Sequence, residues 1–199
     1  MSKKSIIIFA SGSGTNAENI IHHFQSSGNI FVSCVLTNNP VAGVISRAKN
    51  LVVPLKLFDR KEFYETDAVL NFLRQQNPSL IVLAGFLWLV PKKILQSFPK
   101  KIINIHPALL PKFGGKGMFG INVQKEVLAS GEKETGITIH YVNEKYDAGD
   151  IIFQTKCSVD PGDTPETLSE KIHGLENKYF PIVVESLLLE NKIESLSRG

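Results

Sequence analysis

The sequence lacks the features of several protein classes. Only two cysteines, Cys34 and Cys157, occur among its 199 residues, so neither a disulfide framework nor a CxxC metal-binding pattern can form. This scarcity predicts a reducing, cytoplasmic location. The longest apolar stretches, such as Ile81–Val90, fall well short of the roughly 20 residues of a membrane-spanning helix. The apolar part of Met1–Ala10 is too short for a signal peptide. We therefore expect no membrane partner.

The sequence also lacks a large excess of charge of either sign. The 22 Lys and Arg residues and 19 Asp and Glu residues give a net charge of only +3, and no basic block is long enough to predict a nucleic-acid surface. Apolar residues make up 43% and charged residues 21%, which is typical of a globular protein. The length predicts a single domain over residues 1–199. We expect small anionic ligands, no nucleic acid, and a monomer or homodimer.

Short apolar runs alternate with longer amphipathic stretches, a pattern typical of a parallel sheet covered by helices. The predicted strands are Ser5–Ala10, Ile30–Leu36, Val53–Leu57, Leu80–Ala84, Lys101–Ile105, Gly136–Val142 and Ile151–Thr155. The predicted helices are Asn16–Ser26, Val41–Lys49, Lys61–Gln76, Pro91–Phe98, Phe119–Ala129 and Thr164–Leu189. The last two strands are joined by a loop too short for a helical crossover, so they should pair antiparallel. The prediction is an α/β, Rossmann-like domain whose mainly parallel sheet is flanked by helices and carries an antiparallel C-terminal addition.

The first predicted strand runs into Ser11-Gly12-Ser13-Gly14-Thr15-Asn16 and then a helix. Backbone N–H groups at a helix start, with the helix dipole, bind phosphate, and glycines let the backbone approach the anion. The spacing is not that of a P-loop, and the third glycine of a dinucleotide-binding motif is missing. The alternative is a tight strand-to-helix turn with a Ser or Thr cap.

The fifth predicted strand leads into Asn104-Ile105-His106-Pro107. Side chains two apart on a strand share a face, so Asn104 and His106 should project together at the carboxyl edge of the sheet, where α/β proteins bind ligands. An amide and an imidazole there would stabilise an oxyanion and transfer a proton. Asp147, in the loop between the last two strands, is the expected carboxylate partner of His106. The alternatives are a structural Asn–His hydrogen bond and an ordinary Asp-Ala-Gly turn.

Four segments together resemble the formyltransferases that use 10-formyltetrahydrofolate. They are Gly-Ser-Gly-Thr-Asn at 12–16, Leu-Ala-Gly-Phe at 83–86, Asn-Ile-His-Pro-Ala-Leu-Leu-Pro at 104–111, and the downstream Asp147. The resemblance runs from the first strand to the last helix. The phosphate-type loop and the short length point to the branch of this family that formylates glycinamide ribonucleotide. We expect 199 residues to leave no room for the additional domains of its larger relatives.

The resemblance implies a role for each matching residue. His106 would be the general acid, Asn104 would hold the formyl oxygen, and Asp147 would raise the pKa of His106 and relay a proton through water. Gly14, Thr15 and Asn16 would bind the substrate phosphate, and Glu176 its ribose. The residues implied in binding the co-substrate, 10-formyltetrahydrofolate, are Lys61, Leu87, Trp88, Leu89, Val90, Asn104, Asn143, Glu144, Lys145, Tyr146 and Asp147. The implied reaction needs no metal.

The sequence departs from the family pattern in three places. Lys61 stands where relatives usually carry Arg, which keeps the charge but loses the bidentate fork. Trp88 stands where relatives often carry Arg, so stacking replaces a charge there. The glycine-rich segment 113–120 differs from the commoner loop and contains Lys116, which would reach an anionic ligand.

Two alternatives remain at this stage. One is a formyltransferase that acts on another small amine, such as an amino-sugar nucleotide. The other is a non-catalytic module that binds a nucleotide or folate and in which the Asn-x-His pair is structural.

Overall fold

The computed structural model describes residues 3–191, and contacts within the chain group into two compact units, Met1–Ile103 and Asn104–Gly199. Each unit is described by itself below. The single domain over residues 1–199 remains a prediction.

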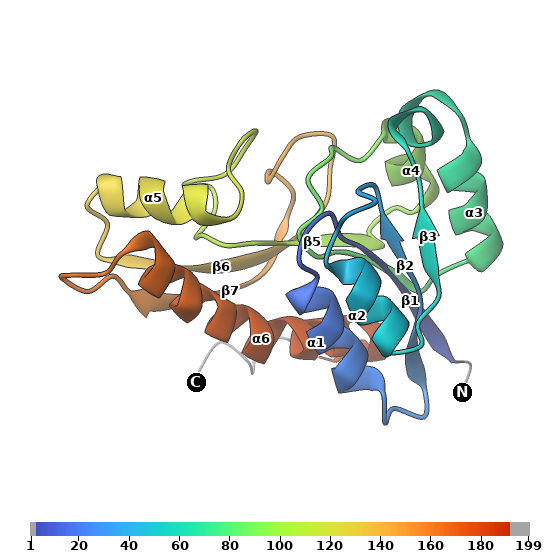
Figure 1. Ribbon diagram of the computed structural model, residues 1–199, viewed down its shortest axis with the longest axis horizontal. Coiled ribbons are helices and arrows are strands. Elements are labelled where there is room, and N and C mark those ends of the chain that lie inside the picture. Colours follow the sequence, from blue (N-terminus) through green and yellow to red (C-terminus); the bar gives the residue numbers. More distant parts are fainter. Residues whose placement is uncertain (1–2, 192–199) are drawn as a thin grey trace. The chain divides into compact units, whose positions relative to one another are not determined.

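Within the described residues the strands form one seven-stranded sheet in the order β3-β2-β1-β4-β5-β6-β7 (Figure 1). The strands are β1 (Lys4–Phe9), β2 (Ile30–Thr37), β3 (Leu55–Leu57), β4 (Leu80–Leu83), β5 (Ile102–His106), β6 (Glu134–Tyr141) and β7 (Ile151–Ser158). Strand β1 pairs parallel with β2 and β4, and β2 pairs parallel with β3, whereas β6 and β7 are antiparallel. These pairings confirm the predicted α/β class and its antiparallel C-terminal addition.

The first unit is built around β1, whose Ile6, Ile7 and Ile8 are fully buried. A parallel strand that is covered on both faces reads as a continuous apolar run, which is why the alternation of a half-exposed strand is missing here. The helices of this unit are α1 (Thr15–Phe24), α2 (Val44–Asn50), the π-helix η1 (Lys61–Glu65), α3 (Ala68–Gln76) and α4 (Lys92–Ser97). Helices α1 and α2 lie side by side (Figure 1).

The second unit contains the C-terminal end of β5, the β6–β7 pair, α5 (Ile121–Ala129) and the long helix α6 (Pro165–Leu189). Helix α6 begins as predicted after Thr164, whose side chain accepts a hydrogen bond from the Thr167 N–H while Thr167 reciprocates. An apolar cluster that includes fully buried Ala108, Val123 and Leu168 joins α5 and α6 to the segment after β5.

Four helix predictions were wrong in their bounds by two residues or more, or in their continuity. The predicted helix Asn16–Ser26 ends at Phe24. The predicted helix Lys61–Gln76 is two elements, because Thr66 is extended and its N–H bonds the Lys61 carbonyl, which closes the π-helical turn before α3 starts. Helix α5 starts two residues later than predicted, after Gly120 with φ 55°. The predicted helix Val41–Lys49 starts only at Val44, after a turn.

Candidate functional site

The glycine loop between β1 and α1 has the geometry of a tight turn. Gly14, at the N-cap of α1, has φ 80°, a left-handed conformation that favours glycine. A Cβ built on Gly14 would lie 2.5 Å from Cβ of Val44 at the start of α2, so a side chain does not fit there. The Ser or Thr cap of the alternative interpretation is absent, since no side-chain hydrogen bond caps α1.

Hydrogen bonds within the first unit hold this loop in place. Ser11 Oγ donates to Asn38 Oδ1 at 2.7 Å and accepts from the Leu87 N–H at 3.2 Å. Arg47 Nε donates to the Ser13 carbonyl at 2.9 Å, and its guanidinium also pairs with Glu18 on α1. The first backbone N–H groups of α1 at Thr15 and Asn16 therefore start from a fixed loop, as a phosphate site requires.

The predicted catalytic side chains converge within the second unit. Asn104 and His106 lie two residues apart on β5 and both contact Asp147. Asn104 Nδ2 lies 3.4 Å from Asp147 Oδ1, and His106 Nδ1 lies 3.5 Å from Asp147 Oδ2. His106 is 3% exposed and the Asp147 side chain 11%, so the pair is held in a largely desolvated environment. The structure thus brings together the three residues that the sequence spacing singled out.

Both ring nitrogens of His106 face acceptors. Nε2 donates to the Phe113 carbonyl at 2.8 Å, and Nδ1 faces the Asp147 carboxylate. Burial lowers the pKa of His106, while the charge of Asp147 and the Phe113 carbonyl act in the opposite direction and offset only part of this effect. The site therefore combines a desolvated imidazole with two groups that favour its protonated form.

Asp147 is held in its charged form. Burial alone would raise the pKa of Asp147, but its interactions with His140 and His106 and a 2.9 Å hydrogen bond from the Gly115 N–H outweigh burial and lower it. Asp147 has φ 51°, an unusual conformation that Asp and Asn tolerate better than most residues. This backbone turn places the carboxylate between the two histidines.

The segment that follows β5 is held by two polar side chains, the buried Thr138 on β6 and the partly buried Gln154 on β7. Thr138 Oγ1 donates to the Ala108 carbonyl at 2.6 Å and accepts from the Leu110 N–H at 3.0 Å. Gln154 Nε2 donates to the Leu110 carbonyl at 3.0 Å and lies 2.8 Å from Thr138 Oγ1. The Pro-Ala-Leu-Leu-Pro segment is therefore rigidly attached to the strands next to His106.

The predicted folate-binding residues of the first unit surround an aromatic cluster. Leu87 is 44% exposed, whereas Val90 is buried, and Trp88 and Leu89 are partly buried. The Trp88 ring contacts Phe58, Phe63, Tyr64 and Phe86.

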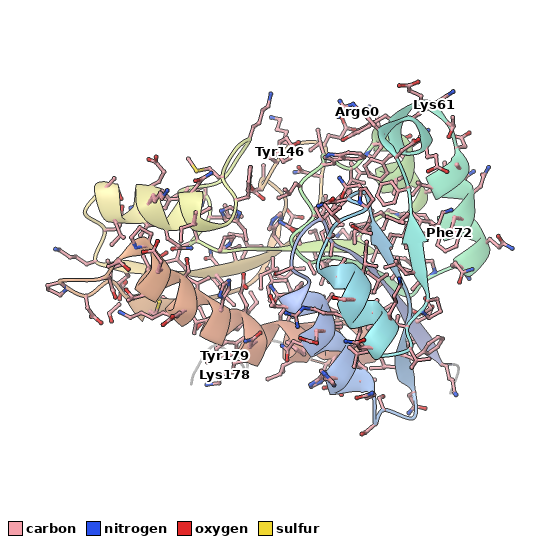
Figure 2. The ribbon with its side chains drawn as sticks, viewed as in Figure 1. Arg60, Lys61, Phe72, Tyr146, Lys178 and Tyr179 are labelled. Atoms are coloured by element: carbon pink, nitrogen blue, oxygen red, sulfur yellow. The ribbon has the colours of Figure 1, made fainter. Side chains whose placement is uncertain are left out.

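Two cationic side chains, Arg60 and the exposed Lys61, come from the start of η1 (Figure 2). The Arg60 guanidinium lies 4.9 Å from the Tyr64 ring centroid and 5.9 Å from that of Trp88. Sequence reasoning named Lys61 and Trp88 but missed Arg60. The sequence feature that could have indicated Arg60 is a second basic residue directly before Lys61.

The remaining predicted residues belong to the second unit. Asn143, Glu144, Lys145 and Tyr146 lie in the exposed β6–β7 loop, where Asn143 Oδ1 accepts from the Lys145 N–H and Asn143 Nδ2 donates to the Ala148 carbonyl. These bonds shape the turn that leads into Asp147. Glu176 lies on α6 and is 7% exposed.

Sequence reasoning gave His140 no role in the site and missed its contacts with Asn104 and Asp147. Its Nε2 lies 3.1 Å from Asn104 Nδ2 and 3.7 Å from Asp147 Oδ1. Strand alternation places His140 on the same face of β6 as Thr138, which holds the segment after β5, but alternation alone does not indicate a partner on β5.

The cysteine and histidine residues considered next lie in surroundings that indicate no catalytic role. Burial raises the pKa of Cys34 to about 11, as expected of a core thiol. His22 and His23 are exposed in the last turn of α1. Over residues 3–191, no three His, Cys, Asp or Glu side chains are placed to hold a metal ion. No helix in the same range is long and apolar enough to cross a membrane.

Comparison with known proteins agrees with this geometry. Residues 4–184 match the formyl transferase family model, which covers most of the chain. The chain belongs to the formyl transferase family. One relative in this family, the chloroplastic phosphoribosylglycinamide formyltransferase of Arabidopsis thaliana, is 39% identical over 195 residues, which cover 94% of this chain and 66% of the relative.

Two further members of the family match over nearly their full length. The phosphoribosylglycinamide formyltransferase of Bacillus subtilis is 37% identical over 96% of this chain and 98% of its own length. The crystal structure of the corresponding protein of Anaplasma phagocytophilum has a TM-score of 0.85 and 33% identity, and covers 95% of this chain and 89% of that one. The chain thus spans just under two thirds of the plant formyl transferase but almost all of the Bacillus one.

Proposed function

We propose that this chain transfers the formyl group of 10-formyltetrahydrofolate to the amine of glycinamide ribonucleotide, a step of purine synthesis. One observation carries the proposal: Asn104 and His106 each have a polar side-chain atom within 3.5 Å of the Asp147 carboxylate, in a chain of the formyl transferase family. The names of the Bacillus and Arabidopsis relatives, both phosphoribosylglycinamide formyltransferases, support glycinamide ribonucleotide as the substrate. A cytoplasmic location, a monomer or homodimer and a reaction without metal remain predictions from the sequence.

The chemistry begins when the neutral substrate amine attacks the formyl carbon. A C–N bond forms and the carbonyl π electrons move to oxygen, which becomes an oxyanion. The amide N–H of Asn104 and the Nε2–H of His106 would stabilise this charge. Because His106 is desolvated, a hydrogen bond from it is stronger than the same bond in water.

The intermediate then loses a proton from the attacking nitrogen and collapses. Asp147, kept ionised by its neighbours, would accept that proton through a water molecule. The bond between the formyl carbon and N10 of the folate breaks, the oxyanion electrons reform the carbonyl, and the proton held by Asp147 passes through water to N10 as tetrahydrofolate departs. Protons and charge are balanced between Asp147, His106 and the leaving group.

The structure adds one requirement to this sequence of steps. The Nε2–H of His106 is used by the Phe113 carbonyl, and Nδ1 faces Asp147. His106 therefore donates to the intermediate only after Phe113 moves off Nε2. Phe113 has φ 56° and is followed by Gly114 and Gly115, so the proposed step requires this glycine-containing segment to rearrange.

Binding roles follow from the local structure of each unit. Gly14, Thr15 and Asn16 would hold the phosphate through backbone N–H groups at the start of α1. Glu176 would accept hydrogen bonds from the ribose hydroxyls. Lys61, the Leu87–Val90 segment and residues 143–147 would bind the folate, with Trp88 offering a stacking surface.

The proposal is tested by mixing the purified protein with 10-formyltetrahydrofolate and a panel of amines. Release of tetrahydrofolate is followed by absorbance, and the formylated product is identified by mass spectrometry. We expect turnover with glycinamide ribonucleotide and much weaker turnover with its dephosphorylated nucleoside. Turnover only with an amino-sugar nucleotide, or calorimetric binding of both ligands without any turnover, would overturn the proposal.

A further inference from the structure

His140 is buried beside the reacting groups but has no part in the steps above. It is 2% exposed and lies near the end of β6. Its Nδ1 lies 2.8 Å from the carbonyl of Tyr141, and its Nε2 lies 3.1 Å from Asn104 Nδ2. The two ring nitrogens therefore meet groups of opposite hydrogen-bonding character.

These contacts decide which nitrogen carries the proton. A backbone carbonyl only accepts hydrogen bonds, so Nδ1 of His140 must carry its proton and donate to Tyr141. In the neutral ring Nε2 is then an acceptor, and an amide NH₂ only donates, so Asn104 Nδ2 donates to it. Asp147 Oδ1 lies farther from Nε2, at 3.7 Å, so the amide of Asn104 is the main partner of His140.

The same contacts fix the orientation of the Asn104 amide. Its Nδ2 faces both His140 Nε2, at 3.1 Å, and Asp147 Oδ1, at 3.4 Å, and these acceptors are only 3.7 Å apart. These three distances place the two acceptors in clearly different directions from Nδ2, so each faces its own N–H of the planar amide. The N–H toward Asp147 Oδ1 makes the longer contact, so it is the one available to a stronger acceptor.

We propose that His140 is a positioning residue that makes Asn104 present an N–H group, rather than its carbonyl oxygen, to the developing oxyanion. A reversed amide would place the Asn104 oxygen against the negative charge and would lose a donor of the kind that oxyanion holes depend on. The inference rests on the proposed formyl transfer, because its effect appears only in that reaction.

The chain is shaped to hold His140 in this place. The pairing of β6 with β7 shifts register between Ile139 and His140. Such irregularities change the direction in which the neighbouring side chains project from a strand. Gly149 lies so close to the Tyr141 carbonyl that a Cβ would be 1.7 Å from it. The carbonyl that holds Nδ1 and the loop that carries Asp147 are therefore packed directly against each other.

A matched pair of substitutions at this position tests the proposal. In His140→Gln the terminal amide oxygen takes the place of Nε2 and still accepts from Asn104. In His140→Asn the shorter side chain takes the place of Nδ1 and reaches only the Tyr141 carbonyl. We expect His140→Asn to lower kcat about 10–100-fold, the usual cost of removing a residue that orients a reacting group. We expect His140→Gln to stay within about threefold of wild type, and KM for both substrates to change little in either variant.

A double-mutant cycle assigns the effect to Asn104. If His140 acts through Asn104, His140→Asn should cost less than about threefold in an Asn104→Ala background, because the group it orients is already gone. The same loss in both backgrounds, or equal kcat in the Gln and Asn variants, would contradict the proposal. Circular dichroism at the assay temperature checks that each variant is folded.

Two outcomes separate this inference from the proposed function. If the wild-type protein fails to formylate glycinamide ribonucleotide, the proposed function is wrong. If wild type turns over and His140→Asn does so equally well, only the role of His140 is wrong. Should His140→Asn not fold, His140→Gln carries the test alone, and a folded Gln variant that loses more than about tenfold in kcat overturns the inference.

Discussion

The glycine loop of the first unit and the histidine–carboxylate cluster of the second unit are built from different chemical groups. The loop relies on backbone N–H groups, a left-handed glycine and hydrogen bonds from Ser11 and Arg47. The cluster relies on ionisable side chains, His106 and Asp147, that are almost completely buried.

The difference suggests a division of labour. A binding site for an anion needs fixed dipoles and room for the ligand, and backbone groups supply both without a change of protonation. Proton transfer needs groups whose protonation can change, and desolvation gives these groups strong mutual interactions. Substitutions in the loop should therefore affect stability and binding, whereas substitutions in the cluster should affect kcat.

The largest expected effect comes from Asp147→Asn. Asparagine tolerates φ 51° and keeps the shape of the side chain, but it cannot take up a proton. We expect kcat for formyl transfer to fall by roughly 10²–10⁴-fold, the range of general acid–base catalysis, with an unchanged circular dichroism spectrum. Near wild-type turnover would show that the carboxylate is only a structural part of its turn.

Gly14→Ala should break the loop through packing and backbone strain. A Cβ at Gly14 would lie 2.5 Å from Val44, and the left-handed conformation costs about 1–2 kcal/mol for a residue with a side chain. With about 1–3 kcal/mol for overpacking, we expect a loss of about 2–5 kcal/mol in the free energy of unfolding, measured with urea. Gly12→Ala is the matched control, because nothing lies within 4 Å of its Cβ position. Equal losses in both variants would refute this explanation.

The pH dependence of stability should also differ between the two regions. The pKa of Asp147 is lower in the folded protein than its ordinary value near 4, so ionised Asp147 stabilises the fold above that pH. This stabilisation disappears as the pH falls through the lowered pKa. The difference in unfolding free energy between wild type and Asp147→Asn should thus shrink between pH 6 and pH 3. A difference that stays constant would mean that the Asp147 pKa is not lowered.

Gly174→Ala should have the smallest effect and the opposite sign. Gly174 is exposed inside α6, and no atom lies within 4 Å of its Cβ position. Alanine is a better helix former than glycine by about 1 kcal/mol, so we expect the unfolding free energy to rise by about 0.5–1 kcal/mol. A destabilised variant would indicate that this glycine, like Gly14, meets a packing requirement.

Much of the architecture could be predicted from local patterns. The buried strands were recognised because β1 and β4 are short apolar runs, and the antiparallel β6–β7 pair because its connection is too short for a helix. The break between η1 and α3 could not be predicted, since Lys61–Gln76 keeps helical periodicity through Thr66. The extended conformation of Thr66 is a tertiary result that propensity does not encode.

The candidate site was predictable only in part for a related reason. Asn104 and His106 are paired by the two-residue repeat of a strand, and the family resemblance pointed to Asp147. His140 was missed because its partner is 36 residues away in sequence, on a different strand. Such cross-strand contacts depend on register and on the irregularity beside His140, which no local pattern reveals.

The central claim is that the buried cluster performs proton transfer in formyl transfer, and His106→Asn tests it most directly. Steady-state turnover with glycinamide ribonucleotide and 10-formyltetrahydrofolate would be measured beside calorimetric binding of each ligand. The account predicts that kcat falls by about 10²–10⁴-fold while both ligands still bind with nearly unchanged affinity. A folded variant with near wild-type kcat would contradict it.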